Sequence, residues 1–344
     1  MAKGGWEVVL MLTTAMAVQA QDRPCNRGSS DLLETEGLSA MRARDYRLAQ
    51  SRLTDAFDAC PENPSILLEL AQAQVSGRNF DGAIRTSKQY LASNPTSTAG
   101  RLALANAYLM ALKLKEALAE ADSILREHPS DPAALKIKAN AAYLLNDVET
   151  SKATFIQLLD RYPEDEDVAY MLGRIYYQEG FIDLAMGQFA RILKRNPSSY
   201  KALDNLGLCN EAQGDYDAAT RHFLAAIKLV EKDHPEYEWP YSNLADLLLK
   251  TGDAQRAFDA AAKAANRNPM SARSFYIGAK ALNQLGKTEL ALNWLQRSAA
   301  LNPTSSETWY LLGIVYRKLQ QNDKAEEAVR TFRDLKAREP ARRR

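Results

Sequence analysis

The stretch that decides the fold is residues 309–332, WYLLGIVYRKLQQNDKAEEAVRTF. Apolar and small residues in its first half recur at the spacing of one helix face, in the order Trp309, Leu312, Gly313 and Tyr316. A polar segment at 320–323 interrupts this pattern. A second apolar stripe follows, formed by Ala325, Ala328, Val329 and Phe332. The stretch therefore predicts two helices joined by a short turn.

Proline recurs along the chain with a period close to 34 residues. Each interval between neighbours is 34 residues, except that Pro235 follows Pro197 by 38. Proline has no N–H to donate and restricts the residue before it to extended conformations, so each one is expected to end a helix. The period indicates one helical hairpin copied end to end, with repeats marked by Pro61, Pro95, Pro129, Pro163, Pro197, Pro235, Pro269 and Pro303.

These residues resemble the tetratricopeptide repeat family, whose pattern is W-x2-L-G-x2-Y, then A-x3-F, then P. The stretch from Trp309 to Tyr316 matches the first-helix signature completely. In the same register, the small residue of the first helix is Gly37, Ala71, Ala105, Ala139, Gly173, Gly207, Ala245, Ala279 and Gly313. The small residue opening the second helix is Ala49, Ala83, Ala117, Ala185, Ala219, Ala257, Ala291 and Ala325, with Ser151 as the one departure.

The resemblance implies an all-α fold, a right-handed α-solenoid of stacked antiparallel helix pairs (the tetratricopeptide superhelix). We expect nine repeats in residues 30–337, preceded by an N-terminal segment at 21–29 and followed by a basic tail at 338–344. Residues 1–20 are predicted to be a signal peptide, because Lys3 precedes an apolar run at 8–18 and small or aliphatic residues stand before a cleavage point after Ala20. The product is expected to be exported, to the periplasm or the medium, with no membrane-spanning segment.

The three cysteines fit an oxidising compartment. Cys25 precedes the first predicted helix and Cys60 ends the second, so an antiparallel pair brings these two residues together. Cys209 stands inside a predicted helix and is interpreted as a small packed residue. Two interpretations stay open: a Cys25–Cys60 disulfide, or three reduced or buried thiols.

Composition excludes several classes of function. Lys+Arg 44 against Asp+Glu 43 gives a net charge of +1, which argues against a dedicated nucleic-acid binder. The sequence contains no HExxH, paired CxxC, G-x-S-x-G or phosphate-binding glycine loop, so no metal or cofactor is expected. With almost the whole chain assigned to repeats, we do not expect an enzyme.

The resemblance also implies where a ligand would bind, because first helices in this family line a concave groove. From the fourth repeat onward the exposed positions change from small or aliphatic residues to amides, tyrosines and cations, which suit a peptide backbone or carboxylate. The twelve candidate binding residues are Asn106, Lys136, Asn140, Tyr170, Arg174, Tyr177, Lys201, Asn205, Asn243, Asp246, Tyr276 and Lys280. Further residues on the same face are Tyr143, Asp204, Trp239, Ser242, Arg273, Tyr310 and Arg317. The alternative is that each is an ordinary solvated residue.

A carboxylate clamp, as some tetratricopeptide adaptors have, is matched only in part. Lys136, Asn140 and Lys201 stand where three clamp residues belong, but Met171 replaces a second Asn and Asn205 replaces an Arg. With nine repeats to sample, a partial match of this kind arises easily. We therefore do not take it as the binding site.

Two local features complete the sequence. The four extra residues around 232–235 either form a loop on a binding face or lengthen a helix by one turn. The acidic run at 164–167 suggests a cation site, but it stands where a helix begins, and carboxylates there favour the positive end of the helix dipole. We interpret this run as a helix start.

The function expected from the sequence is an exported scaffold that binds a protein or peptide partner in the groove. The alternative is a structural component of an envelope assembly, such as polysaccharide export or secretion machinery. In that case the convex face or the ends of the array make permanent contacts.

Overall fold

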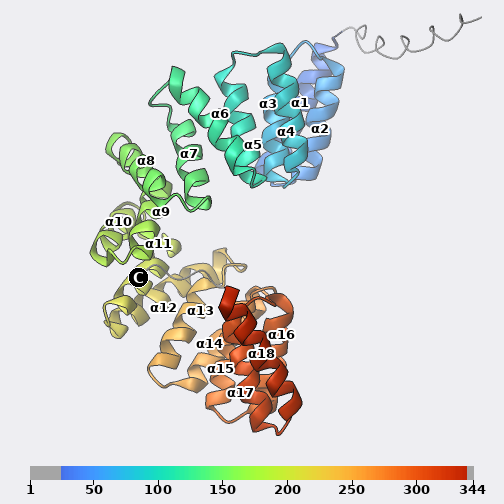
Figure 1. Ribbon diagram of the computed structural model, residues 1–344. Coiled ribbons are helices and arrows are strands. Elements are labelled where there is room, and N and C mark those ends of the chain that lie inside the picture. Colours follow the sequence, from blue (N-terminus) through green and yellow to red (C-terminus); the bar gives the residue numbers. More distant parts are fainter. Residues whose placement is uncertain (1–24, 339–344) are drawn as a thin grey trace, which may run out of the picture. The chain divides into compact units, whose positions relative to one another are not determined.

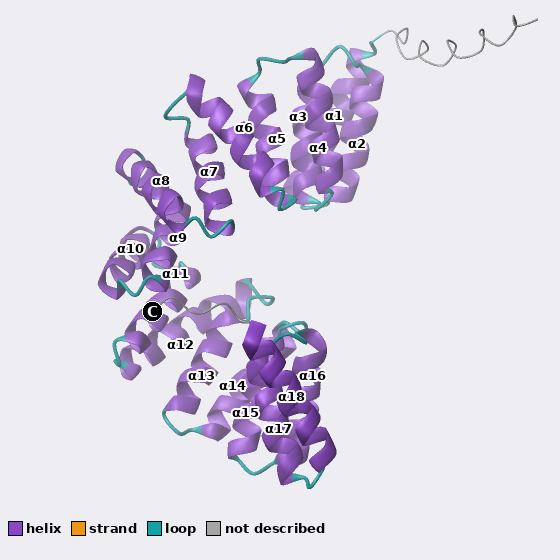
Figure 2. Cartoon of the chain, viewed as in Figure 1, coloured by secondary structure: helices purple, strands orange, loops and turns teal. Residues whose placement is uncertain are grey.

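The computed structural model describes residues 25–338 (Figure 1). The predicted signal peptide at 1–20, most of the N-terminal segment and nearly all of the basic tail lie outside these residues. The described part is built from helices and contains no strand (Figure 2). The prediction of an all-α helical repeat solenoid is confirmed.

The chain divides into two compact units, 1–163 and 164–344. Within the first unit, consecutive helices pack in antiparallel pairs, and the first helices of neighbouring pairs also touch each other. Its helices are α1 (Arg27–Arg42), α2 (Tyr46–Ala59), α3 (Ser65–Ser76), α4 (Phe80–Ser93), α5 (Thr98–Met110), α6 (Leu114–Glu127), α7 (Pro132–Leu144) and α8 (Val148–Arg161).

The second unit repeats the same arrangement, with odd-numbered first helices and even-numbered second helices. Its helices are α9 (Glu166–Gln178), α10 (Ile182–Arg195), α11 (Tyr200–Ala212), α12 (Tyr216–Asp233), α13 (Trp239–Lys250), α14 (Ala254–Arg267), α15 (Ala272–Gln284), α16 (Thr288–Leu301), α17 (Ser306–Lys318) and α18 (Asn322–Arg338). None of the helices in the described range is long and apolar enough to span a membrane.

Small residues lie where the two helices of a pair cross. Gly173 packs against the Phe189 ring and Gly207 against the Phe223 ring, and both rings are fully buried. Between α15 and α16, the expected Ala279 is fully buried in one cluster with Leu295, and the preceding Gly278 also packs against the indole of Trp294. The extra room at Gly278 admits a ring larger than the leucine at the next position.

Each hairpin turn contains one residue in the left-handed backbone conformation. In the turn between α5 and α6 this residue is Leu112, and the next N–H, of Lys113, donates to the Tyr108 carbonyl at 2.9 Å. Glycine fills the position in four turns and another residue in five. The set is Arg44, Arg78, Leu112, Asn146, Gly180, Gly214, Gly252, Gly286 and Gln320.

The four extra residues lengthen a helix. Helix α12 has 18 residues, whereas α10 and α14 on either side of it have 14 each. Four residues are about one helical turn. The interpretation of added helix length is therefore confirmed, and the chain then reaches α13 through a short connection at 234–238.

The acidic run also begins a helix, as predicted. Asp165 caps α9, and its side chain accepts a hydrogen bond from the backbone N–H of Val168 at 3.2 Å. Glu166 and Asp167 occupy the first turn. This arrangement satisfies a free N–H group and places negative charge at the positive end of the helix dipole.

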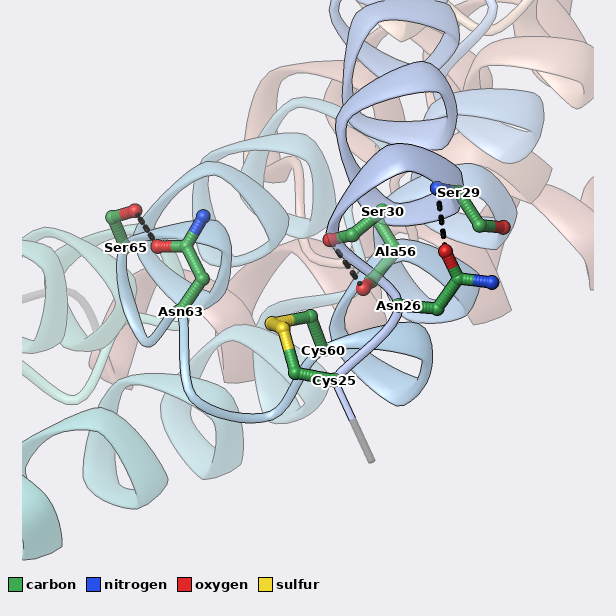
Figure 3. Close-up of a disulfide and its surroundings, with 8 residues drawn as sticks. All are labelled: Cys25, Asn26, Ser29, Ser30, Ala56, Cys60, Asn63 and Ser65. Carbon is green, nitrogen blue, oxygen red and sulfur yellow. Dashed lines mark hydrogen bonds between the residues drawn. A yellow bond between two sulfur atoms is a disulfide. The ribbon is translucent and has the colours of Figure 1, made fainter. Parts of the chain in front are cut away.

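Cys25 and Cys60 form a disulfide that joins the start of α1 to the end of α2 (Figure 3). Beside it, the Asn26 N–H donates to the Ala59 carbonyl at 2.9 Å, and the Ser30 hydroxyl donates to the Ala56 carbonyl at 2.9 Å. The third cysteine, Cys209, is a buried free thiol in α11, and burial raises its pKa to about 12. The first hairpin is thus closed by both covalent and hydrogen bonds.

Candidate protein-binding surface

Three of the predicted binding residues belong to the first unit. Asn106 lies on α5, and Lys136 and Asn140 lie on α7, all half-buried. The Asn140 side-chain amide donates to the Lys136 carbonyl at 2.8 Å, so it is partly engaged by its own helix. Lys201, the remaining residue of the partial clamp, belongs to the second unit.

The other nine predicted residues lie on first helices of the second unit. On α9 and α11, the Asn205 amide donates to the Lys201 carbonyl at 2.9 Å and to the Tyr170 hydroxyl at 3.4 Å. The Arg174 guanidinium lies 5.9 Å from the centre of the Tyr170 ring. Asn205 is only 9% exposed, so its amide joins α9 to α11 and is not open to a partner. Tyr177 is half-buried nearby on α9, where burial is the main cause that raises its pKa.

Helices α11, α13 and α15 are connected by four residues that we call the polar chain: Asp204, Asn243, Arg273 and Asp246. The Arg273 guanidinium donates to the Asn243 amide oxygen at 2.8 Å, and the Asn243 amide N–H donates to the Asp204 carboxylate at 2.8 Å. Arg273 also pairs with Asp246 at 3.4 Å. The amide oxygen and the amide N–H of Asn243 are therefore both bonded to other residues of the protein. Its position on the helix alone did not predict this structural role.

Asp204 lies at the inner end of the polar chain and is 2% exposed. Burial raises the pKa of this carboxyl to about 7, and the charge of Glu238 acts in the same direction. The hydrogen bond from Asn243 and the charge of Arg273 act against this shift. Asp204 therefore sits where a carboxyl group changes charge close to neutral pH.

Tyr237 lies near this carboxyl and belongs to a small group of aromatic residues. Tyr237, in the connection after the lengthened α12, lies 4.8 Å from Tyr200, whose ring also lies 4.4 Å from the His234 ring. Burial raises the pKa of the Tyr237 hydroxyl, with Asp204 and Tyr170 adding to the effect. The connection that follows the added turn of α12 thus places Tyr237 near Asp204 of the polar chain.

The outer end of the polar chain is accessible. Trp239 is 47% exposed, and the Arg273 guanidinium lies 5.7 Å from its ring centre. Asp246, Arg273 and Tyr276 line a cavity of about 270 Å³ together with Glu307 on α17. We call these residues the second-unit surface: Trp239, Asp246, Arg273, Tyr276 and Glu307. Burial raises the pKa of Tyr276, with Glu307 and Asp246 contributing, and Lys280 lies half-buried one turn further along α15.

The sequence placed these residues on one face but did not rank them. Arg273 and Asp204 belonged only to the wider set, yet they form the two ends of the Asn243 contacts. Glu307 was not identified at all. It could have been identified from the sequence, because Glu307 occupies on α17 the same repeat position that Arg273 occupies on α15.

The fold and this surface define a class of helical repeat proteins that present side chains from successive first helices. The tetratricopeptide repeat pattern matches residues 35–98, 138–191 and 243–306, together more than half of the chain. Further tetratricopeptide patterns match 78–141, 198–270 and 294–327. The chain belongs to the tetratricopeptide repeat family, whose fold serves in general as a scaffold for protein interactions.

Solved structures agree with this fold. A tetratricopeptide repeat protein from Parabacteroides merdae ATCC 43184 is 22% identical, with a TM-score of 0.61 over 74% of this chain and 99% of its own. The APC/C hetero-tetramer Cut9-Hcn1 matches with 19% identity and a TM-score of 0.64, over 83% of this chain and 56% of its own. No curated protein matches the chain by sequence.

Proposed function

We propose that this protein is an exported scaffold that binds a protein or peptide segment at the second-unit surface. The observation that supports this most directly is the fixed position of Arg273. A long cation normally loses much side-chain freedom on binding, at a cost of about 0.5–1.5 kcal/mol. Here hydrogen bonds to Asn243 and Asp246 already restrict it.

The chemistry of the surface suits a polar partner segment. Trp239 offers apolar area, Arg273 offers N–H groups for a carbonyl or carboxylate, and Glu307 offers an exposed acceptor for a cation. Asp246 and Glu307 place negative charge in the same cavity as the positive charge of Arg273. We therefore expect a peptide that carries both acidic and basic side chains.

Binding is tested by capture from an extract of the host envelope with the mature chain, residues 21–344, as bait. We expect Arg273→Ala to lower the amount of captured partner at least about tenfold, since a central arginine often contributes more than about 1.4 kcal/mol. Arg330→Ala, which removes an exposed arginine on α18 of the same unit, is the matched control. Equal capture by both variants and the unaltered chain would contradict the proposal.

Export is proposed from the signal-peptide pattern and is consistent with a disulfide in the first hairpin. The full chain fused to alkaline phosphatase, which is active only outside the cytoplasm, should give activity. The fusion that starts at Gln21 should give none. Mass spectrometry of the exported product should find Gln21 at its N-terminus.

A permanent role in an envelope assembly is the second candidate. It is favoured by an apolar cavity of about 180 Å³ between α12, α13 and α14, with Leu224 46% exposed at its edge. In this case Leu224→Asp should release the captured partner while Arg273→Ala retains it.

A further inference from the structure

The polar chain has a direction. Arg273 donates to Asn243, and Asn243 donates to Asp204, so both N–H groups point toward the buried carboxylate. Its inner end is closed to solvent, whereas Arg273 at the outer end lies between Trp239 and Asp246 on the second-unit surface. One amide, that of Asn243, therefore connects the buried carboxyl of Asp204 to the partly exposed cation of Arg273.

We infer that protonation of Asp204 controls how firmly Arg273 is held at the second-unit surface. The consequence for partner binding rests on the proposed function, but the change within the chain does not. With Asp204 ionised, the surface presents Arg273 in its fixed position. With Asp204 protonated, the bond from Arg273 to Asn243 weakens, and Arg273 is held mainly by Asp246.

The physical reason is the strength of a hydrogen bond to an ionised acceptor. Such a bond is roughly twice as strong as one between neutral groups, and each bond in a series polarises the next. Ionised Asp204 thus holds Asn243, and the polarised amide oxygen of Asn243 holds Arg273. The opposing effect is desolvation, since a carboxylate with almost no exposure is penalised in its charged form. Desolvation is the larger effect, because the pKa of Asp204 is raised to about 7, and both forms of the carboxyl are therefore populated near neutral pH.

Several other charged and titratable groups face this region. Helix α9 contributes Tyr170, α11 contributes Tyr200, α13 contributes Asp246 and α15 contributes Arg273. The connection at 234–238 contributes His234, Tyr237 and Glu238, and the Glu238 carboxylate is buried and accepts from Asn268 at 3.0 Å. One of these groups, His234, is a histidine, the residue type that most often acts as a pH switch in proteins. A test must therefore separate Asp204 from His234.

The experiment follows the indole N–H resonance of Trp239 by NMR in the mature chain between pH 5 and 9, without any partner. The resonance is assigned with Trp239→Phe. We expect its position to titrate with a midpoint near the pKa of Asp204, about 7. Asp204→Asn keeps an acceptor for Asn243 but cannot ionise, so it should remove the titration. His234→Phe keeps a ring beside Tyr200 and should leave the midpoint unchanged.

A second measurement needs no substitution at Asp204. Aspartate labelled with carbon-13 at the side-chain carboxyl reports the protonation of Asp204 directly, and its midpoint should coincide with that of Trp239. A Trp239 resonance that stays flat, or that still titrates in Asp204→Asn, overturns the inference, as does a titration lost in His234→Phe. A partner that binds elsewhere would refute the proposed function and leave this result standing.

Discussion

Gly207 shows how much of the packing depends on the absence of one side chain. A Cβ atom at this position would clash with the edge of the Phe223 ring, which is fully buried between α11 and α12. Gly187 on α10 is the opposite case, because a Cβ there meets no atom within 4 Å. Two helical glycines in one unit therefore carry different constraints, one of packing and one only of helix propensity.

We expect Gly207→Leu to lower the free energy of unfolding of the second unit by about 3 kcal/mol, through overpacking against Phe223. Gly187→Ala should raise it by about 0.5–1 kcal/mol, because alanine loses less backbone freedom in a helix. Denaturant unfolding of the two variants beside the unaltered chain measures both changes. A Gly207→Leu variant that unfolds at the same denaturant concentration would show that the helices do not cross there.

At this scale the repeat register predicted the crossing glycines, including Gly173 and Gly207, because their spacing repeats with the helix pairs. It did not predict the contact of Gly278 with Trp294, because the repeat pattern assigns no residue type to these two positions. The burial of Asn205 and Asn243 was also out of reach. Helix periodicity assigns a side chain to a face, but burial there depends on partners from adjacent helices, such as Tyr170 for Asn205 and Asp204 for Asn243.

Among the elements, the hairpin turns are sites of repeated backbone strain. The left-handed conformation costs a residue with a Cβ about 1–2 kcal/mol, and five of the turns place such a residue there. Leu112 is the clearest instance, since its side chain is 69% exposed and offers little packing in return. Gly214 fills the equivalent position after α11 without this penalty.

Leu112→Gly is therefore expected to stabilise the first unit by about 0.5–1 kcal/mol, because relief of the left-handed strain exceeds the added freedom of the unfolded chain. The reciprocal change, Gly214→Ala, forces a residue with a Cβ into the left-handed conformation. It should destabilise the second unit by about 1 kcal/mol through this backbone strain alone, because no atom lies within 4 Å of the added Cβ. Thermal unfolding followed by circular dichroism measures both. Shifts of the same sign in the two variants would refute this account of the turn.

The repeat predicted the helix lengths and the turns. For the extra residues at 232–235, however, the sequence allowed either a loop or an added helical turn. Four residues equal a helical turn and also the length of a short loop. The register of the following helix is the same in either case. Only the continuation of α12 to Asp233 distinguished them.

For the whole molecule, stability is expected to be local, because each hairpin touches only its neighbours. The disulfide belongs to the first hairpin and closes a loop with a sequence separation of 35 residues. Its removal should therefore affect one end of the array and leave the rest in place.

The double substitution Cys25→Ala with Cys60→Ala is expected to lower the stability of the first hairpin by about 2–4 kcal/mol. Amide hydrogen exchange should show faster exchange in α1 and α2 and unchanged exchange in α11–α18. Reduction of the unaltered chain is the control, and it should reproduce the pattern of the double variant. Faster exchange throughout the second unit would show that stability is shared more widely than nearest-neighbour packing allows.

The fold class of the whole chain was predictable from the 34-residue period, since that spacing admits a helical hairpin and little else. The division into units at residue 163 was not. The 34-residue spacing of the prolines continues through this point, and the hairpins on either side both have small residues at their crossings, Ala139 and Ser151 before it and Gly173 and Ala185 after it.

The odd third thiol places a constraint on maturation. In an unfolded chain under oxidising conditions, three cysteines allow three different single bridges, and two of these would involve Cys209. Once α11 has packed, Cys209 has no exposure, and its proton is held so tightly that little reactive thiolate forms. Early packing of α11 in the second unit would therefore remove the competing thiol before Cys25 and Cys60 are oxidised.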